Sequence, residues 1–308
     1  MPNGPDSSFI AVPSAIRRAD NRSSNSAHAL NRIDATFAKL RSAGRTGLIP
    51  YVTVGDPSLA TMPALLDAIA AAGADIIELG VPFSDPMADG PVIQRASERA
   101  LLQHVGLRDV LAVVHDFRAR DRVTPIVLMG YANPIEAMGE TLFADRAAEA
   151  GVDGVLVVDY PPEEAADFSR LLHAREIAPI FLVSPTTPDA RVAAVAALAR
   201  GYVYYVSLKG VTGAGHLDTA DVARRLAEIR RHVRLPVGVG FGIRDAMSAS
   251  AIAAHADAIV IGSRIIEEIE QSPPGEAAAR AGLWLAGIRH ALDAKLGSDS
   301  HFAFQETK

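Results

Sequence analysis

The sequence predicts an α/β protein of the (β/α)8 TIM-barrel class with an extra N-terminal helix, and three observations support this. Short apolar runs alternate with amphipathic segments along most of the 308 residues. Eight strands, nearly all followed by a helix, imply a parallel sheet, since each crossover must return the chain to the same edge. The segment 72–77, Ala-Gly-Ala-Asp-Ile-Ile, recurs in similar form at 150–155 and 254–259, where a helix turns into a buried strand. A doubly wound open sheet is the alternative, but no Gly-x-Gly-x-x-Gly follows the first strand.

The expected elements follow from the spacing of apolar residues. The first is a helix over 31–43, in which Ile33, Phe37 and Leu40 recur at helical spacing. Later helices show one apolar face, and the strands are short apolar runs ended by Gly, Pro or polar residues. The expected strands are 48–54, 75–79, 125–129, 153–158, 179–183, 202–207, 236–239 and 258–261. The expected later helices are 59–72, 92–102, 109–120, 140–150, 163–173, 188–199, 219–232, 245–254, 264–270 and 275–295.

The chain divides into three expected parts. Residues 1–29 are rich in Ser, Asn, Arg and Pro without periodicity, which predicts a disordered extension. Residues 30–296 form the barrel catalytic domain, and 297–308 are expected to be a loose tail. An organelle transit peptide would also be rich in Arg and Ser, but Asp6 and Asp20 argue against one.

Composition narrows the function classes. The formal net charge is -6 and no long basic run occurs, which argues against a nucleic-acid partner. No apolar stretch reaches about 18 residues, so no membrane span is expected. The chain has no Cys, which excludes disulfides and thiolate sites and fits a reducing cytoplasm. The nine His residues show no paired ligand spacing, so no metal site is expected.

The segment 76–91 carries the most informative carboxylates. Glu78 interrupts an apolar strand, and Asp85 and Asp89 follow in the next loop. Ionised carboxylates are costly to bury without a partner, so this arrangement indicates either a satisfied ion pair or a site. Two carboxylates in different surroundings can titrate apart and divide acid and base work. An ion pair of Glu78 with an arginine, with the loop aspartates capping turns, is the competing interpretation.

Other polar groups are expected to gather near these carboxylates. In a (β/α)8 barrel the site lies at the C-terminal ends of the strands, where Tyr51, Met129, Tyr131 and Tyr204 stand. Three glycine-rich turns, at 210–215, 240–242 and 262–263, come late in the chain. Such turns let the backbone approach an anion, and loops after the last strands commonly hold phosphate. Simple turn glycines with Ser263 as a helix cap are the alternative.

The segment 78–91, Glu-Leu-Gly-Val-Pro-Phe-Ser-Asp-Pro-Met-Ala-Asp-Gly-Pro, closely resembles the signature of the tryptophan synthase alpha chain family. The likeness covers about residues 31–295, while the first 29 residues match nothing in the family core. It continues through 50–57, 129–134, 210–213, 240–243 and 262–263.

The resemblance implies a carbon–carbon lyase of tryptophan biosynthesis in the cytoplasm. Its reaction would be the retro-aldol cleavage of indole-3-glycerol phosphate to indole and glyceraldehyde 3-phosphate, with no metal and no organic cofactor in this chain. The implied partner is a pyridoxal-phosphate beta chain in an α2β2 heterotetramer. A stand-alone lyase, another phosphate-binding barrel and a non-catalytic activator of a beta chain are the alternatives.

The resemblance also implies roles for single residues. Glu78 would be the main acid/base, and Asp89 would face the indole N–H. Pro82 and Asp85 would lie on the loop that faces the beta chain. Some members have Phe where Tyr51 stands. The other substrate-binding positions would be Tyr51, Ile93, Met129, Tyr131, Tyr204 and Thr212, and the phosphate would be held by Gly213, Phe241, Gly242, Gly262 and Ser263.

Overall fold

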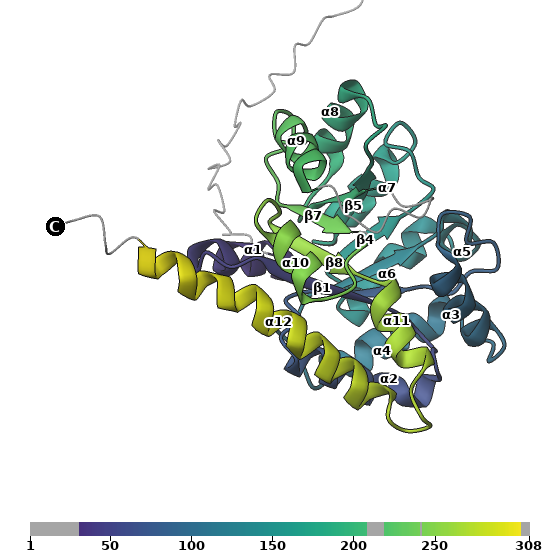
Figure 1. The fold of residues 1–308 in the computed structure, drawn as a ribbon. Coiled ribbons are helices and arrows are strands. Elements are labelled where there is room, and N and C mark those ends of the chain that lie inside the picture. The colour runs from purple at the N-terminus through teal and green to yellow at the C-terminus, as the bar shows by residue number, and fades with distance from the viewer. Residues whose placement is uncertain (1–30, 208–218, 241, 303–308) are drawn as a thin grey trace, which may run out of the picture.

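The computed structural model describes residues 31–207, 219–240 and 242–302, with side chains as far as residue 294. Eight parallel strands pair in chain order, and β1 pairs with β8 to close a barrel. The predicted (β/α)8 TIM barrel is therefore confirmed, with helices covering the outside of the sheet (Figure 1). The strands are β1 (Gly47–Thr53), β2 (Ile77–Gly80), β3 (Ile126–Gly130), β4 (Gly154–Val157), β5 (Ala178–Val183), β6 (Val203–Val206), β7 (Val237–Gly240) and β8 (Ala258–Ile261).

The predicted N-terminal helix is α1, which packs against the interior of the barrel. Its buried Ile33 and Phe37 join a core cluster with inward-facing strand residues, and the Phe37 ring centroid lies 5.8 Å from that of Tyr202. The remaining helices form the outer layer, where the long α12 packs against α2, α10 and α11. None of the described helices combines the length and hydropathy needed to cross a membrane.

The bounds of the helices agree closely with the sequence pattern. They are α1 (Arg32–Ser42), the 3-10 turn η1 (Leu59–Thr61), α2 (Met62–Ala71), α3 (Pro91–Leu101), α4 (Leu107–Arg118), α5 (Ala132–Met138), α6 (Glu140–Ala150), α7 (Ala166–His173), α8 (Asp189–Leu198), α9 (Thr219–Ile229), α10 (Ala246–Ala253), α11 (Ser263–Glu270) and α12 (Ala277–Phe302).

Two local expectations are wrong. No helix is expected between 129 and 140, but the segment around Asn133-Pro134 forms α5. Pro134 lies in the first turn of that helix, where a missing N–H leaves no hydrogen bond unmade. The final helix is expected to end at 295, but α12 continues to Phe302. A glycine inside a helix, as Gly297 is here, costs only about 1 kcal/mol, which its neighbours can offset.

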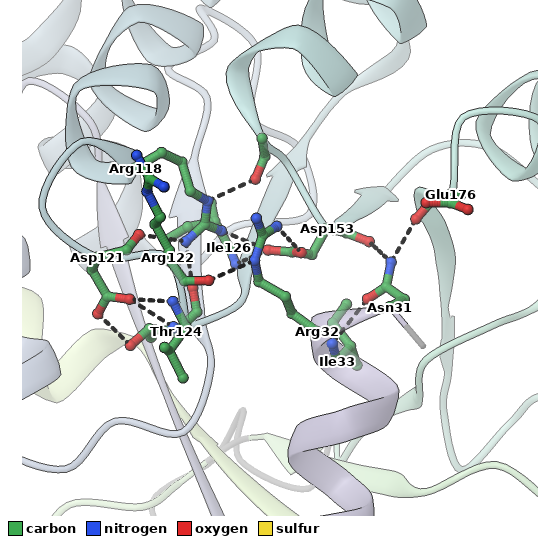
Figure 2. A network of polar contacts seen from close by, with 12 residues as sticks. Asn31, Arg32, Ile33, Arg118, Asp121, Arg122, Thr124, Ile126, Asp153 and Glu176 are labelled. Carbon is green, nitrogen blue, oxygen red and sulfur yellow. Dashed lines mark hydrogen bonds and ion pairs between the residues drawn. The ribbon is translucent and has the colours of Figure 1, made fainter. Parts of the chain in front are cut away.

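The repeated motif of the sequence builds a recurring contact that we term the aspartate clamp. In the clamp, an aspartate that stands just before an even-numbered strand accepts a hydrogen bond from a backbone N–H at the start of the preceding strand. Asp153 accepts hydrogen bonds from Ile126 N at 2.8 Å, Arg118 Nη2 at 2.6 Å and Arg32 Nη1 at 2.8 Å. Figure 2 shows these groups converging on Asp153 from α1, the end of α4 and β3. The clamp thus ties two helices to the sheet.

The same clamp occurs at two other strand pairs. Asp75 accepts from Leu48 N at 2.9 Å, and Asp257 accepts from Val237 N at 2.9 Å. Each of these carboxylates also pairs with an arginine from a covering helix or its end. These are the three aspartates of the repeated sequence motif, so the motif encodes a backbone contact at the N-terminal end of the barrel.

The fourth strand pair, β5–β6, lacks the clamp for a reason visible in the sequence. Phe181 pairs with Val203, and two residues before them stand Pro179 and Gly201. Proline has no backbone N–H, so a carboxylate opposite it would receive no hydrogen bond. Gly201 adopts a φ of +70° there, a conformation that an aspartate rarely takes.

Candidate active site

Glu78 is the second residue of β2, and its side chain lies inside the barrel. Its side chain is fully buried, and one oxygen, Oε1, accepts a hydrogen bond from the Tyr202 hydroxyl. The other oxygen, Oε2, is buried without a hydrogen-bond partner among the described residues. Burial raises the pKa of Glu78 to about 7, although the Tyr202 hydrogen bond lowers it. Both protonation states are therefore accessible near neutral pH.

The competing interpretation of Glu78 is not what the structure shows. No arginine or lysine in the described part of the chain forms an ion pair with it, and a tyrosine is its partner instead. Sequence reasoning missed Tyr202, which directly precedes β6 and stands two residues before the predicted Tyr204. The alternation of strand side chains places both tyrosines on the same inner face, and that signal could have found it.

Asp89 is held in the loop between β2 and α3 by contacts from two other elements. Its Oδ2 accepts a hydrogen bond from the Tyr131 hydroxyl at 3.0 Å, and that hydroxyl in turn accepts from Ala88 N at 3.1 Å. Gln94 on α3 donates to the Asp89 carbonyl at 2.8 Å. Burial raises the pKa of Asp89, and the Tyr131 hydrogen bond lowers it. The carboxylate is thus fixed in orientation before a ligand arrives.

Tyr131 is itself braced from the loop. Its ring stacks on Phe83, with centroids 5.1 Å apart and planes inclined by 29°. Tyr131 directly follows β3, so the stack ties the carboxylate loop to the neighbouring strand. Asp85, by contrast, is exposed on that loop and accepts a hydrogen bond from the adjacent Ser84 hydroxyl at 2.5 Å.

Two tyrosines lean over glycines of the neighbouring strands. A Cβ on Gly80 would lie 2.0 Å from the Tyr51 hydroxyl oxygen, and one on Gly240 would lie 2.1 Å from that of Tyr204. Each ring therefore occupies the volume that a side chain on the next strand would fill. Asp89 and Glu78 both raise the pKa of each tyrosine electrostatically, after burial as the main cause. The two acids and the two tyrosines thus share one end of the barrel.

The glycine-rich turn after β8 lies beside Tyr51 and Ile93. A Cβ on Gly262 would lie 3.5 Å from Ile93 Cδ1 and 3.7 Å from Tyr51 Cβ. Gly262 is the N-cap of α11, and Ser263 is the first residue of that helix. The backbone N–H groups in the first turn of a helix have no partner within the helix, so they can bind an anion. Gly262, Ile93 and Tyr51 are therefore neighbours, as the predicted binding set requires.

The remaining predicted residues fall into two groups. Met129 is half-buried at the end of β3, in register with Gly80, and Gly242 has a φ of +70° just after β7. Thr212, Gly213 and Phe241 lie outside the described residues. Within the described ranges, no group of three or more His, Asp or Glu side chains is placed to hold a metal ion.

Comparison with known proteins identifies the family to which the chain is similar. The tryptophan synthase alpha chain family matches residues 37–286. The tryptophan synthase alpha chain of Bordetella parapertussis is 64% identical over 273 residues, covering 85% of this chain and 95% of its own length. That of Nitrosomonas europaea is 58% identical over 266 residues, covering 86% and 97%.

Solved structures give the same result. Tryptophan synthase subunit alpha from Legionella pneumophila superposes with a TM-score of 0.82 at 42% identity, covering 86% of this chain and all of that one. An aminoacrylate-bound tryptophan synthase from M. tuberculosis contains a chain with a TM-score of 0.76 at 31% identity, covering 85% and 99%. The extent of these matches shows that this chain belongs to the tryptophan synthase alpha chain family.

Proposed function

We propose that Glu78 is the acid/base of the reaction that the chain catalyses as a member of this family. That reaction cleaves indole-3-glycerol phosphate to indole and glyceraldehyde 3-phosphate, which makes the chain a carbon–carbon lyase of tryptophan biosynthesis. The observation that carries the assignment is the buried, unpartnered Oε2 of Glu78. A buried polar atom without a partner has an energetic cost, which is typical of a group that waits for substrate.

The reaction needs a group that both gives and takes a proton. Breaking the bond between indole C3 and the arm leaves an electron pair on C3, where a neutral ring accepts it poorly. Protonation of C3 creates an indolenine cation that accepts the pair well. Removal of the proton from the adjacent hydroxyl then forms the aldehyde as the bond breaks. A carboxyl group with a pKa of about 7 can perform both transfers in turn at neutral pH.

Asp89 supplies a complementary negative charge. In the protonated ring, positive charge develops on the indole nitrogen, and a fixed carboxylate facing that nitrogen stabilises it. The hydrogen bond from Tyr131 holds the Asp89 carboxylate in place before the charge develops, so no reorganisation is needed at the moment of reaction. We therefore assign Asp89 the role of the electrostatic partner and Tyr131 that of its support.

The phosphate would bind at the other end of the cavity. Gly262 and Ser263 present the N-terminus of α11, and Gly242 allows the backbone after β7 to approach an anion. Gly213 and Phe241 stay predicted phosphate ligands, and Thr212 stays a predicted substrate contact. The half-buried Met129 and Tyr204 would complete the apolar wall around the ring.

The decisive experiment is indole release by purified Glu78→Gln. The variant keeps the size of the side chain and an acceptor for Tyr202, but it cannot exchange a proton. We expect cleavage to fall by about 10²–10⁴-fold while a phosphate ligand still binds, since general acid–base catalysis contributes a factor of that size. Glu149→Gln, an exposed substitution on α6, is the matched control. Substantial turnover by Glu78→Gln would refute the assignment.

The partner and the location are separate proposals. We propose an α2β2 complex with a tryptophan synthase beta chain, and the related M. tuberculosis tryptophan synthase supports it. The loop before α3 exposes Met87, with 85% of its surface accessible, as an interface would require. A shift in size-exclusion elution on adding a beta chain tests the complex, and indole assays with and without it test the stand-alone alternative. Fractionation of the source cells tests the cytoplasmic location.

The division of the chain is also a proposal. We propose that 30–296 is the catalytic barrel and that the extension at 1–29 is dispensable for cleavage, because the family match begins only at residue 37. A chain that starts at residue 30 should retain the indole-forming activity of the full chain. A large loss of activity in that truncated chain would contradict this division.

A further inference from the structure

The Tyr51 side chain reaches from the phosphate turn to the acid/base. Its Cβ and Cδ1 lie beside Gly262, at 3.7 Å from the position a Cβ would take there, whereas its hydroxyl lies over Gly80. Glu78 and Gly80 are two residues apart on β2, so they present the same inner face of the strand. The hydroxyl therefore stands on the side of Glu78, while the base of the ring stands beside Gly262.

A substrate arm must connect the same two places. The proposed function places a phosphate at Gly262 and a reacting carbon at Glu78, joined by three carbons. Ile93 also borders Gly262, at 3.5 Å from the position a Cβ would take there. The ring of Tyr51 is thus expected to run alongside the arm, with its hydroxyl near the carbons that carry the hydroxyl groups of the substrate.

The hydroxyl of Tyr51 has an unused donor. Its one hydrogen bond in the described part of the chain comes from the Thr53 hydroxyl, which donates to it at 3.4 Å. The Tyr51 proton itself has no acceptor there, although the residue is only 6% exposed. Burial and the nearby Asp89 raise the pKa of Tyr51, so the phenol keeps its proton at neutral pH. A buried donor without an acceptor is destabilising unless a ligand supplies one.

We propose that the Tyr51 hydroxyl donates a hydrogen bond to a hydroxyl oxygen of the glycerol arm and so selects a hydroxylated arm over a saturated one. The inference rests on the proposed function of the site, and it assigns Tyr51 a polar role in addition to that of an apolar wall. A phenylalanine at this position would keep the apolar contact with the ligand but would no longer favour a hydroxylated arm over a saturated one.

The test compares two ligands on two proteins. Indole-3-glycerol phosphate and indole-3-propanol phosphate share the ring, the three-carbon arm and the phosphate, but only the first carries arm hydroxyls. Dissociation constants are measured by calorimetry in the Glu78→Gln background, where the substrate is not consumed, with and without Tyr51→Phe. We expect Tyr51→Phe to weaken glycerol phosphate binding about three- to tenfold, the range of one neutral hydrogen bond, and to change propanol phosphate binding less than twofold.

Each outcome decides the inference. An equal loss for both ligands would show that Tyr51 acts through packing alone, and no loss for either would show that the donor is unused; both results overturn the proposal. Tyr205→Phe removes a buried hydroxyl from the core cluster between barrel and helices and should leave both constants unchanged. The two hypotheses can fail separately, because the comparison measures binding and not cleavage. A wild-type chain that failed to cleave the substrate would refute the proposed function, whereas the role of Tyr51 is decided by the dissociation constants alone.

Discussion

The buried carboxyl of Glu78 should make the stability of the protein depend on pH in a defined direction. Burial raises its pKa from 4.5 in the unfolded chain to about 7 in the folded protein. Between these values the folded state holds a proton that the unfolded state has released, so stability is full below about 4.5 and is lost as the pH rises through 7. A shift of this size corresponds to about 3 kcal/mol, at about 1.4 kcal/mol per unit of pKa.

Glu78→Gln removes this dependence, because its amide never ionises and still accepts a hydrogen bond from Tyr202. We expect the free energy of unfolding of the variant to exceed that of the wild type by up to about 3 kcal/mol at pH 9. Near pH 4.5 the difference should disappear. Urea unfolding of both proteins from pH 4.5 to 9 measures it, since the contributions of all other groups cancel. A constant difference, or a variant that becomes relatively weaker at high pH, would refute the burial argument.

Three further substitutions test other parts of the structure. Asp153→Asn leaves two arginines without their buried partner and should lower the free energy of unfolding by about 3 kcal/mol or more in urea. Tyr131→Phe removes a donor that lowers the pKa of Asp89, so the acid limb of the kcat/KM profile should move to higher pH. Gly80→Ala places a Cβ within 2.0 Å of the Tyr51 hydroxyl and should cost about 1–3 kcal/mol of stability and weaken substrate binding.

Each of these has a control that leaves the feature intact. Asp67→Asn breaks an exposed ion pair and should change stability by less than about 1 kcal/mol. Tyr160→Phe, a tyrosine away from the site, should leave the pH profile in place. Gly106→Ala meets no atom within 4 Å and should not weaken substrate binding. If a control variant changed the measured property as much as its paired variant does, the contact removed by the paired variant would not be the cause of the change.

The fold could be predicted from sequence because its determinants are local. Alternating apolar and amphipathic segments fix the order of strands and helices, and parallel crossovers leave few closed topologies. The repeated motif that contains Asp75, Asp153 and Asp257 was correctly placed at the start of strands. Its purpose as a clamp was not predictable, because the partners of Asp153 lie 27, 35 and 121 residues away in the chain. The helix α5 was missed because Asn133-Pro134 resembles a break when its position in the first turn is unknown.

Only those site residues could be predicted that strand alternation or a sequence motif identifies. Glu78 could be identified because a carboxylate in an apolar strand is costly to bury. Tyr202 could not be paired with it from sequence, since β2 and β6 are not neighbours in the sheet and only the closed barrel brings them face to face. An aromatic residue in a buried strand is ordinarily core, and the pattern alone gives no sign that its hydroxyl meets a carboxylate.

The open end of the barrel depends on two tyrosine–glycine pairs. The interior of an eight-stranded barrel is just wide enough for side chains to fill, so a site at its end needs space that packing would otherwise take. Tyr51 and Tyr204 lean over Gly80 and Gly240 on the following strands, which places both rings along the wall. A larger residue at either glycine would push a ring toward the axis. The two glycines therefore leave room for both rings against the strands, while Glu78 interacts electrostatically with both hydroxyls.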